Sequence, residues 1–558
     1  MTTAPGTGTS HHSPSSTRTP TRTRALAGVG ALVRFGLRRD RVRLPVWILA
    51  LFAGTLATAG NYRTLYADPE DRASIATTMN SPAGLAMTGP RHYLDDYTFG
   101  AMLGHQMLGF TAVLVGLMSV LTVTRHTRAE EETGRAELVR STAVGRHAHL
   151  AAALIVAALA NLALALLLAL GLSGLGVGSV DTGGSLLYGF AHAAVGLVFA
   201  GTAAVTVQIT AHARGASGMA LAVIGAAYVL RAAGDAGGDG GDALSWLSPI
   251  GWAQRTYAYV DDRVWPLLLC LALAVLTAAA GFALSTRRDV GAGLRAARLG
   301  NAAASGALSR PLGFALRLHR GMLLGFGAGL LLMGAMYGSI LGDAEDMLKN
   351  IEQIQEAIEE IGGATVAESF ASIVMIVISV VAAVYAVMAA LRPRSEETAG
   401  RAEPLLATGL SRARWAGSHL AVATAGGTAL LLAAGIGFGA SGAASTGDGA
   451  LFGKLTVAAL AYAPALWVTS GLTLALFGWF PRAVAAAWIV PVYAFVVGYL
   501  GQLLQFPDWM NNLSPFGHIP RLPAAEFDWT PPVLLTLLAA GLVWLGLAGF
   551  RRRDLETK

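Results

Sequence analysis

Charged residues and cysteine are scarce in this sequence of 558 residues. Charged side chains make up only 13% of the chain and hydrophobic ones 54%, whereas a soluble protein carries roughly 25% charged residues. The single cysteine, Cys270, lies in an apolar run, so one chain can form neither a disulfide bond nor a thiolate metal cluster. So little charge on so long a chain indicates that lipid covers most of its surface.

Nucleotide-binding and catalytic motifs are absent as well. The nearest approach to the phosphate-binding pattern G-x-x-x-x-G-K-S/T is GALFGKL at residues 449–455, which has the wrong spacing and ends on a leucine. Neither H-E-x-x-H nor a nucleophile elbow occurs. We therefore expect that the chain is not an enzyme by itself and binds no cofactor or metal.

Long apolar segments fill the chain beyond residue 24. A bilayer core needs about 20 apolar residues per helix, and the sequence offers about twelve such segments, which predicts an all-α integral membrane protein. They lie at residues 44–62, 98–124, 148–173, 185–210, 217–232, 264–284, 321–341, 367–391, 417–440, 452–479, 483–503 and 531–550. The fifth is short and polar at its end. Residues 1–24 hold no apolar stretch, so we expect a disordered tail and no cleaved signal peptide.

The distribution of charges predicts the orientation in the membrane. With the N-terminus inside, the inner segments carry 31 of the 40 basic residues but only 11 of the 34 acidic ones, a net charge of +20, and the outer segments carry −14. This asymmetry follows the positive-inside rule. It places both termini in the cytoplasm and accounts for the basic pI near 9.5 without a nucleic-acid partner.

The sequence contains an internal repeat. RAEEETGRAELVRSTAVGR at residues 128–146 matches RSEETAGRAEPLLATGLSR at an offset of 266, and WLSPIGWAQR at residues 246–255 matches NLSPFGHIPR at the same offset. FGLRRDR at residues 35–41 resembles FALRLHR, at an offset of 279, and RRD ends both halves, at residues 287–289 and 552–554. Two motifs that keep their spacing in both copies indicate a duplication.

Each half of the chain therefore contains six predicted spans. Six spans per copy make the two halves parallel repeats, related by an axis along the membrane normal. The predicted organisation is a disordered cytoplasmic tail at residues 1–24, a first six-helix half at 25–290, a cytoplasmic linker at 291–312 and a second six-helix half at 313–558.

The charged inner loop between the second and third span of each half is the most informative feature. Glu131 precedes Arg135 by four residues and Glu397 precedes Arg401 by four, so each pair can bridge along one helical face. One interpretation is a solvated helix that such pairs stabilise. The recurrence of the charged loop in both halves favours a second interpretation, in which the two loops dock onto a two-fold symmetric soluble partner.

Each half also carries an outer S-P-x-G segment, with Pro249 and Gly251 in the first half and Pro515 and Gly517 in the second. Helix-breaking residues at membrane depth are tolerated only where protein or a water-filled cavity surrounds them. These segments are interpreted either as short re-entrant helices near the outer mouth or as ordinary outer turns.

Two kinds of amphipathic segment accompany the spans. The basic segments at residues 35–41 and 314–320 fit interfacial helices or plain positively charged flanks. Residues 343–363 carry apolar residues at heptad spacing. This spacing predicts an outer helix that caps the second half or forms a coiled-coil contact.

Polar residues inside the predicted spans are few, and no acidic residue lies well inside one. Intramembrane polar groups are functional candidates, although uncharged ones more often hydrogen-bond a neighbouring helix. The candidates for a substrate path are His105, Gln106 and Asn161, and the other polar residues are His192, Gln208 and Tyr228.

Three of these patterns together resemble a known family. RRDRVRLPVW at residues 38–47, the E-E-x-x-G-R-A-E inner loops and NSPAGLA at residues 80–86 look like actinobacterial ABC-2-type exporter permeases of the polyketide-antibiotic and tetronasin exporter family. The resemblance covers nearly the whole chain beyond the tail. It implies that each six-helix half acts as one subunit of a two-fold exporter in the bacterial plasma membrane.

The resemblance also implies roles for the duplicated motifs. The inner loops would be coupling helices that sit in clefts of a separate ABC ATPase, two copies of which bind ATP and Mg²⁺ for each permease chain. ATP would close the ATPase, move the two halves and open a central path outward for lipophilic compounds. The coupling residues carried over are Glu131, Gly134, Arg135, Glu137, Glu397, Gly400, Arg401 and Glu403, and the outer gate residues are Pro249, Gly251, Pro515 and Gly517.

Two other functions stay open at this point. A 6+6 secondary transporter driven by an ion gradient predicts an essential carboxylate inside the membrane, and none is evident in the spans. A membrane scaffold or immunity protein that only binds partners predicts no ATP-dependent drug resistance.

Overall fold

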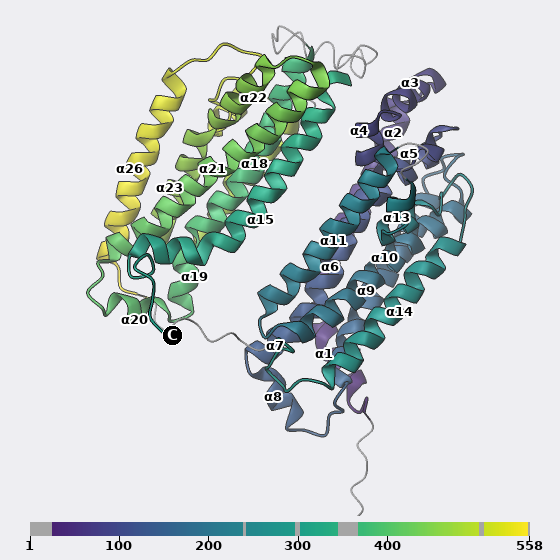
Figure 1. Cartoon of the computed structure of the whole chain (residues 1–558), viewed down its shortest axis with the longest axis horizontal. Coiled ribbons are helices and arrows are strands. Elements are labelled where there is room, and N and C mark those ends of the chain that lie inside the picture. The colour runs from purple at the N-terminus through teal and green to yellow at the C-terminus, as the bar shows by residue number, and fades with distance from the viewer. Residues whose placement is uncertain (1–24, 238–241, 296–301, 344–365, 501–506, 556–558) are drawn as a thin grey trace, which may run out of the picture. The chain divides into compact units, whose positions relative to one another are not determined.

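The computed structural model describes residues 25–237, 242–295, 302–343, 366–500 and 507–555 (Figure 1). Over these ranges the chain is helical and contains no β-strand. The chain forms two compact units, Met1–Arg72 with Leu85–Arg298 and Ala73–Gly84 with Leu299–Lys558. The predicted tail and nearly all of the predicted outer helix at residues 343–363 lie outside the described residues.

Eleven helical segments in the described chain are long and apolar enough to cross a membrane, which confirms the all-α membrane fold. In the first half they are α2 (Arg43–Leu65), Phe99–Glu132, α9 (Ala148–Ser173), α10 (Thr182–Ile209), α11 (Ala213–Ala236) and α14 (Trp265–Ser285). In the second half they are α15 (Pro311–Ser339), Ala367–Thr398 with α18 (Val366–Ala390), α21 (Arg412–Thr446), Ala450–Trp479 with α22 (Ala450–Leu460) and α23 (Ala463–Trp479), and α26 (Thr530–Arg552).

The predicted segment at residues 483–503 corresponds to a shorter apolar helix, Val484–Gly498. The segment begins with a 3-10 turn, η5 (Val484–Trp488), and continues as α24 (Ile489–Leu500). The last residues of the predicted segment lie outside the described part of the chain. The weakest of the predicted spans, residues 217–232, is a full span, α11, with seven buried residues along it.

The helix α10 lies at the centre of the first unit. It packs against α6 (Leu108–His126), α9, α11 and α14. Small residues face these contacts, since helices in lipid associate through close packing of their backbones. A Cβ atom on Gly281 of α14 would lie 2.9 Å from the carbonyl oxygen of Ala204 in α10.

In the second unit α21 and α23 occupy the central positions. The helix α21 packs against α15, α18, α22 and α23, and α23 also packs against α26. Gly546 of α26 follows Gly281 by 265 residues, and a Cβ atom there would lie 2.7 Å from the carbonyl carbon of Leu474 in α23. In each half, the sixth span thus approaches the fourth closely at a glycine.

The basic segments before the first span differ between the halves. In the first half α1 (Val29–Arg39) is a separate helix, and a turn at residues 40–42 leads into α2. In the second half residues 314–320 belong to α15 and run continuously into the span. Asp40 and His319, which occupy corresponding positions in the weaker repeat, are both buried.

Candidate functional site

The two inner loops have the same backbone design. In the first, α7 (Arg128–Glu132) is followed by Gly134 and then by α8 (Arg135–Arg140); in the second, α19 (Arg392–Thr398) is followed by Gly400 and then by α20 (Ala402–Leu406). The two glycines have φ angles of +73° and +69°. Because other residues rarely adopt this left-handed conformation, glycine lets the helix break at the same place in both loops.

This break makes the predicted ion pairs within the loops wrong. The expected partners, Glu131 with Arg135 and Glu397 with Arg401, required an unbroken helix. The left-handed glycine turns the second helix away, so Arg135 approaches Glu130 at 3.8 Å and Arg401 contacts Glu396 at 2.6 Å. In both loops the arginine therefore pairs with the glutamate five residues before it.

Glu131 and Glu397 instead hold each loop to the end of the sixth span. Both oxygens of Glu131 accept hydrogen bonds from Arg288 at 2.8 Å, and those of Glu397 accept from Arg553 at 2.8 and 2.6 Å. Bidentate arginine–carboxylate pairs are strong and directional. We call these two contacts the loop–helix ion pairs. The repeated RRD cluster was visible in the sequence, but its partner was missed.

The opposite side of each loop faces solvent. Glu137 and Glu403 are exposed, and 60% of the Arg135 side chain and 56% of the Arg401 side chain are accessible. Leu138, where the second half has Pro404, is 73% exposed. The eight predicted coupling residues thus divide into a buried pair of glutamates, two backbone glycines and four exposed charges, and their coupling role stays a prediction.

Ion pairs also fix α1 to the inner loop and to the end of α6 in the first unit. Arg39 donates to Glu130, and Asp40 contacts Arg125 at 3.1 Å and His126 at 2.7 Å. Burial alone would raise the pKa of Asp40, but the hydrogen bond from His126 and the charges of His126 and Arg125 hold it below its ordinary value. The carboxylate therefore stays ionised and holds the turn between α1 and α2.

The outer segments share a turn but not a helix. Ser248 accepts hydrogen bonds from the backbone of Ile250 and Gly251, and so caps α13 (Pro249–Gln254); Ser514 accepts from the backbone of Phe516. A Cβ atom on Gly251 would lie 2.3 Å from the Ser245 carbonyl oxygen, and one on Gly517 would lie 2.1 Å from that of Asn511. Both segments require glycine because they fold back on the chain six residues earlier.

The first outer segment is buried among the spans, whereas the second is a series of turns. The helix α13 packs against α6, α10, α11 and α14, which agrees with the re-entrant interpretation for the first half. Around Pro515 the backbone forms turns after α25 (Asp508–Leu513). A gating role for either segment stays a prediction.

A buried charged cluster beside the first outer segment was not predicted. Asp235, at the end of α11, accepts from Ser245 at 2.7 Å and pairs with Arg255 at 3.2 Å and Arg231 at 3.7 Å. All four side chains are buried. Arg255 stood in the repeated motif, and it was the one signal in the sequence for this cluster.

The candidate path residues make hydrogen bonds inside the first unit. His105 lies in a π-helical turn, Leu103–Met107, and contacts Thr88 at 3.0 Å and Tyr97 at 2.9 Å. Gln106 also contacts Tyr97, and Asn161 donates to Ser119 at 2.9 Å. The bond from Asn161 in α9 to Ser119 in α6 matches the helix–helix alternative, whereas Thr88 and Tyr97 lie outside the helices. A substrate path stays a prediction.

A metal site was not expected from the sequence. Within the part of the chain that the structure describes, no group of three or more histidine, cysteine or acidic residues could hold a metal ion.

The eleven apolar spans of the described residues and the duplicated, charged inner loop define a multi-pass protein of the cell membrane. A family model described as the multidrug efflux system permease Rv1217c, C-terminal domain, matches residues 32–284 and 308–551. The chain is also 40% identical over 550 residues to the multidrug efflux system permease protein Rv1217c of Mycobacterium tuberculosis, covering 97% of this chain and 98% of the relative. The chain therefore belongs to this family of multidrug efflux permeases.

Proposed function

We propose that this chain is the membrane-spanning subunit of an ATP-driven ABC exporter and that a separate ATPase supplies the energy. The mycobacterial relative is named as a permease of a multidrug efflux system, and this sequence carries no phosphate-binding loop motif of its own. Two copies of the ATPase, one for each inner loop, would bind ATP and Mg²⁺.

The duplicated inner loop carries this proposal. Its exposed side presents Arg135 and Glu137 in the first half and Arg401 and Glu403 in the second. Its buried side is joined to the sixth span by the loop–helix ion pair. Because separating a buried ion pair is costly, a partner that moves the exposed side also moves the end of that helix.

The proposed cargo consists of lipophilic compounds that enter from the inner leaflet. The spans offer apolar walls and few charges, and alternating access would move the compound along His105, Gln106 and Asn161 toward the outer segments. The family resemblance implies polyketide antibiotics as a narrower class of cargo. The name of the relative supports drugs of several classes.

Replacing Glu137 and Glu403 together by alanine tests the proposal. Both side chains are exposed, so we expect normal folding, loss of co-purification with the ATPase and an export rate about 10-fold lower, as for rim charges that guide association. Glu526→Ala, an exposed glutamate on the predicted outer side, is the matched control. Unimpaired ATP-dependent export in the double variant, or a wild-type chain that binds no ATPase, would exclude this mechanism.

The ion-gradient alternative needs a carboxylate in the membrane. Asp235 in α11 is a buried carboxylate within a span, but it is paired with Arg231 and Arg255. Its two arginine partners make it part of a buried structural cluster. Vesicles that export a drug with a proton gradient and without ATP would favour the alternative.

A further inference from the structure

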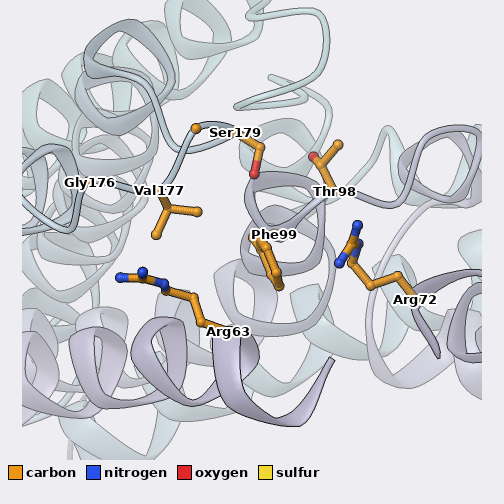
Figure 2. Close-up of a pocket in the computed structure, with 8 residues that line it drawn as sticks. Arg63, Arg72, Thr98, Phe99, Gly176, Val177 and Ser179 are labelled. Carbon is orange, nitrogen blue, oxygen red and sulfur yellow. The ribbon is translucent and has the colours of Figure 1, made fainter. Parts of the chain in front are cut away.

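The outer side of the first unit contains a cavity of about 390 Å³ that the proposed transport cycle does not use (Figure 2). This volume lies in the range of about 300–1,000 Å³ found for small-molecule sites. The cavity is formed by the outer end of α2, the start of α3 (Pro69–Met79), the start of α5 (Phe99–Met102) and the loop between α9 and α10. Its lining residues are Arg63, Arg72, Thr98, Phe99, Gly176, Val177, Gly178 and Ser179.

Two arginines and no carboxylate line this cavity. Arg72 donates to the carbonyl oxygens of Tyr66 and Ala67 at 2.8 Å, and its guanidinium lies 4.7 Å from the centre of the Phe99 ring. Arg63 lies 3.4 Å from the carbonyl oxygen of Leu175. Arg63 is exposed and Arg72 is half-buried, and neither forms an ion pair with any residue that the structure describes.

Two hydroxyl groups border the same space. The oxygen of Thr98 accepts from the backbone of Ala101 and that of Ser179 from the backbone of Gly100, both at 3.3 Å. These bonds fix the oxygens and leave the O–H groups available to donate. Figure 2 shows Thr98 and Ser179 on one side of the Phe99 ring and the two arginines beside and below it.

We propose that this cavity binds the phosphate group of an anionic phospholipid from the outer leaflet. Guanidinium forks match phosphate oxygens, and two hydroxyl donors can complete the set. Arg63 stands near the outer end of α2, where a span of this length would reach the lipid headgroups. Phe99 and Val177 supply apolar surface for the glycerol and the first acyl carbons. A soluble phosphate ester shares this chemistry, and the experiment separates the two sources.

The test uses the full chain in phosphatidylcholine nanodiscs that contain phosphatidylglycerol, with retained lipid measured by native mass spectrometry. We expect preferential retention of phosphatidylglycerol, reduced about 10-fold by Arg63→Gln or by Arg72→Gln, because each removes hydrogen bonds to a charged group. Arg72→Lys should retain more phosphatidylglycerol than Arg72→Gln, since the positive charge remains. Arg91→Gln changes an exposed arginine outside the cavity and should have no effect.

Equal retention of both lipids, or an Arg91→Gln effect as large as that of Arg63→Gln, would overturn the proposal. Glycerol 1-phosphate is then added to the wild-type complex. Failure to displace phosphatidylglycerol supports the lipid, whereas displacement would assign the site to a soluble phosphate ester and overturn the lipid assignment. The measurement needs neither ATP nor the ATPase, so its outcome is independent of the proposed function.

Discussion

Replacing Glu397 by glutamine should loosen the second inner loop from the end of α26. Only 3% of the Glu397 side chain and 13% of the Arg553 side chain are exposed, and the guanidinium of Arg553 lies about 5 Å from the rings of Phe477 and Phe550. The substitution leaves a nearly buried positive charge without this carboxylate. In a fully buried pair such a loss costs about 3–5 kcal/mol.

We expect a smaller cost, about 2–3 kcal/mol, because Arg553 is partly exposed and glutamine keeps one acceptor oxygen. Since about 1.4 kcal/mol changes an equilibrium constant tenfold, the opening constant of the loop should rise about 30- to 150-fold. Hydrogen–deuterium exchange of the backbone amides in α19 and α20 measures this local opening.

The matched control for this experiment is Glu403→Gln, which changes an exposed glutamate in the same loop and should leave the exchange unchanged. The double variant Glu397→Gln with Arg553→Gln should exchange more slowly than the two single effects combined predict, because no buried charge is left alone. Equal exchange in Glu397→Gln and Glu403→Gln, or strictly additive effects, would refute the reasoning.

Three further predictions concern packing and charge. Because the pKa of Asp40 is lowered, its ion pairs stabilise the turn before α2 fully at a pH above 3.8, the ordinary pKa of this carboxyl, and this stability is lost as the pH falls through the lowered pKa. Limited proteolysis of this turn should therefore increase in acid in the wild type and depend less on pH in Asp40→Asn. Gly251→Ala should destabilise the fold by about 1–3 kcal/mol, whereas Gly453→Ala in α22, with open space around it, should stabilise it by up to about 1 kcal/mol, and equal thermal midpoints would contradict the close approach at Gly251. Asp235→Asn should cost about 3–5 kcal/mol, and adding Arg231→Met should recover part of the lost midpoint; an unchanged midpoint in the single variant would argue against a structural role of the cluster.

The class of protein could be read from the sequence because the bilayer acts on each span separately. Length and apolar character decide whether a segment such as residues 148–173 crosses the membrane, and both are local properties. The matched motifs at an offset of 266 likewise required no structure. The comparisons confirm the permease class, and the narrower polyketide-antibiotic class stays a prediction.

The contacts of the candidate sites could not be predicted in the same way. A spacing of four residues favoured a pair between Glu131 and Arg135, and a single left-handed glycine between them removed it. The partner that the structure supplies, Arg288, is 157 residues away. Similarly, Asp235 was not singled out as a functional residue, because its burial depends on α13 and on Arg255.

The sequence by itself thus determined the membrane fold and the duplication. Only the tertiary structure decided which glutamates face solvent and which hold the loop to the sixth span. The physical reason is that hydrophobicity and repeats are carried by neighbouring residues. Ion pairs, close glycine contacts and cavities depend instead on distances between residues that the fold brings together.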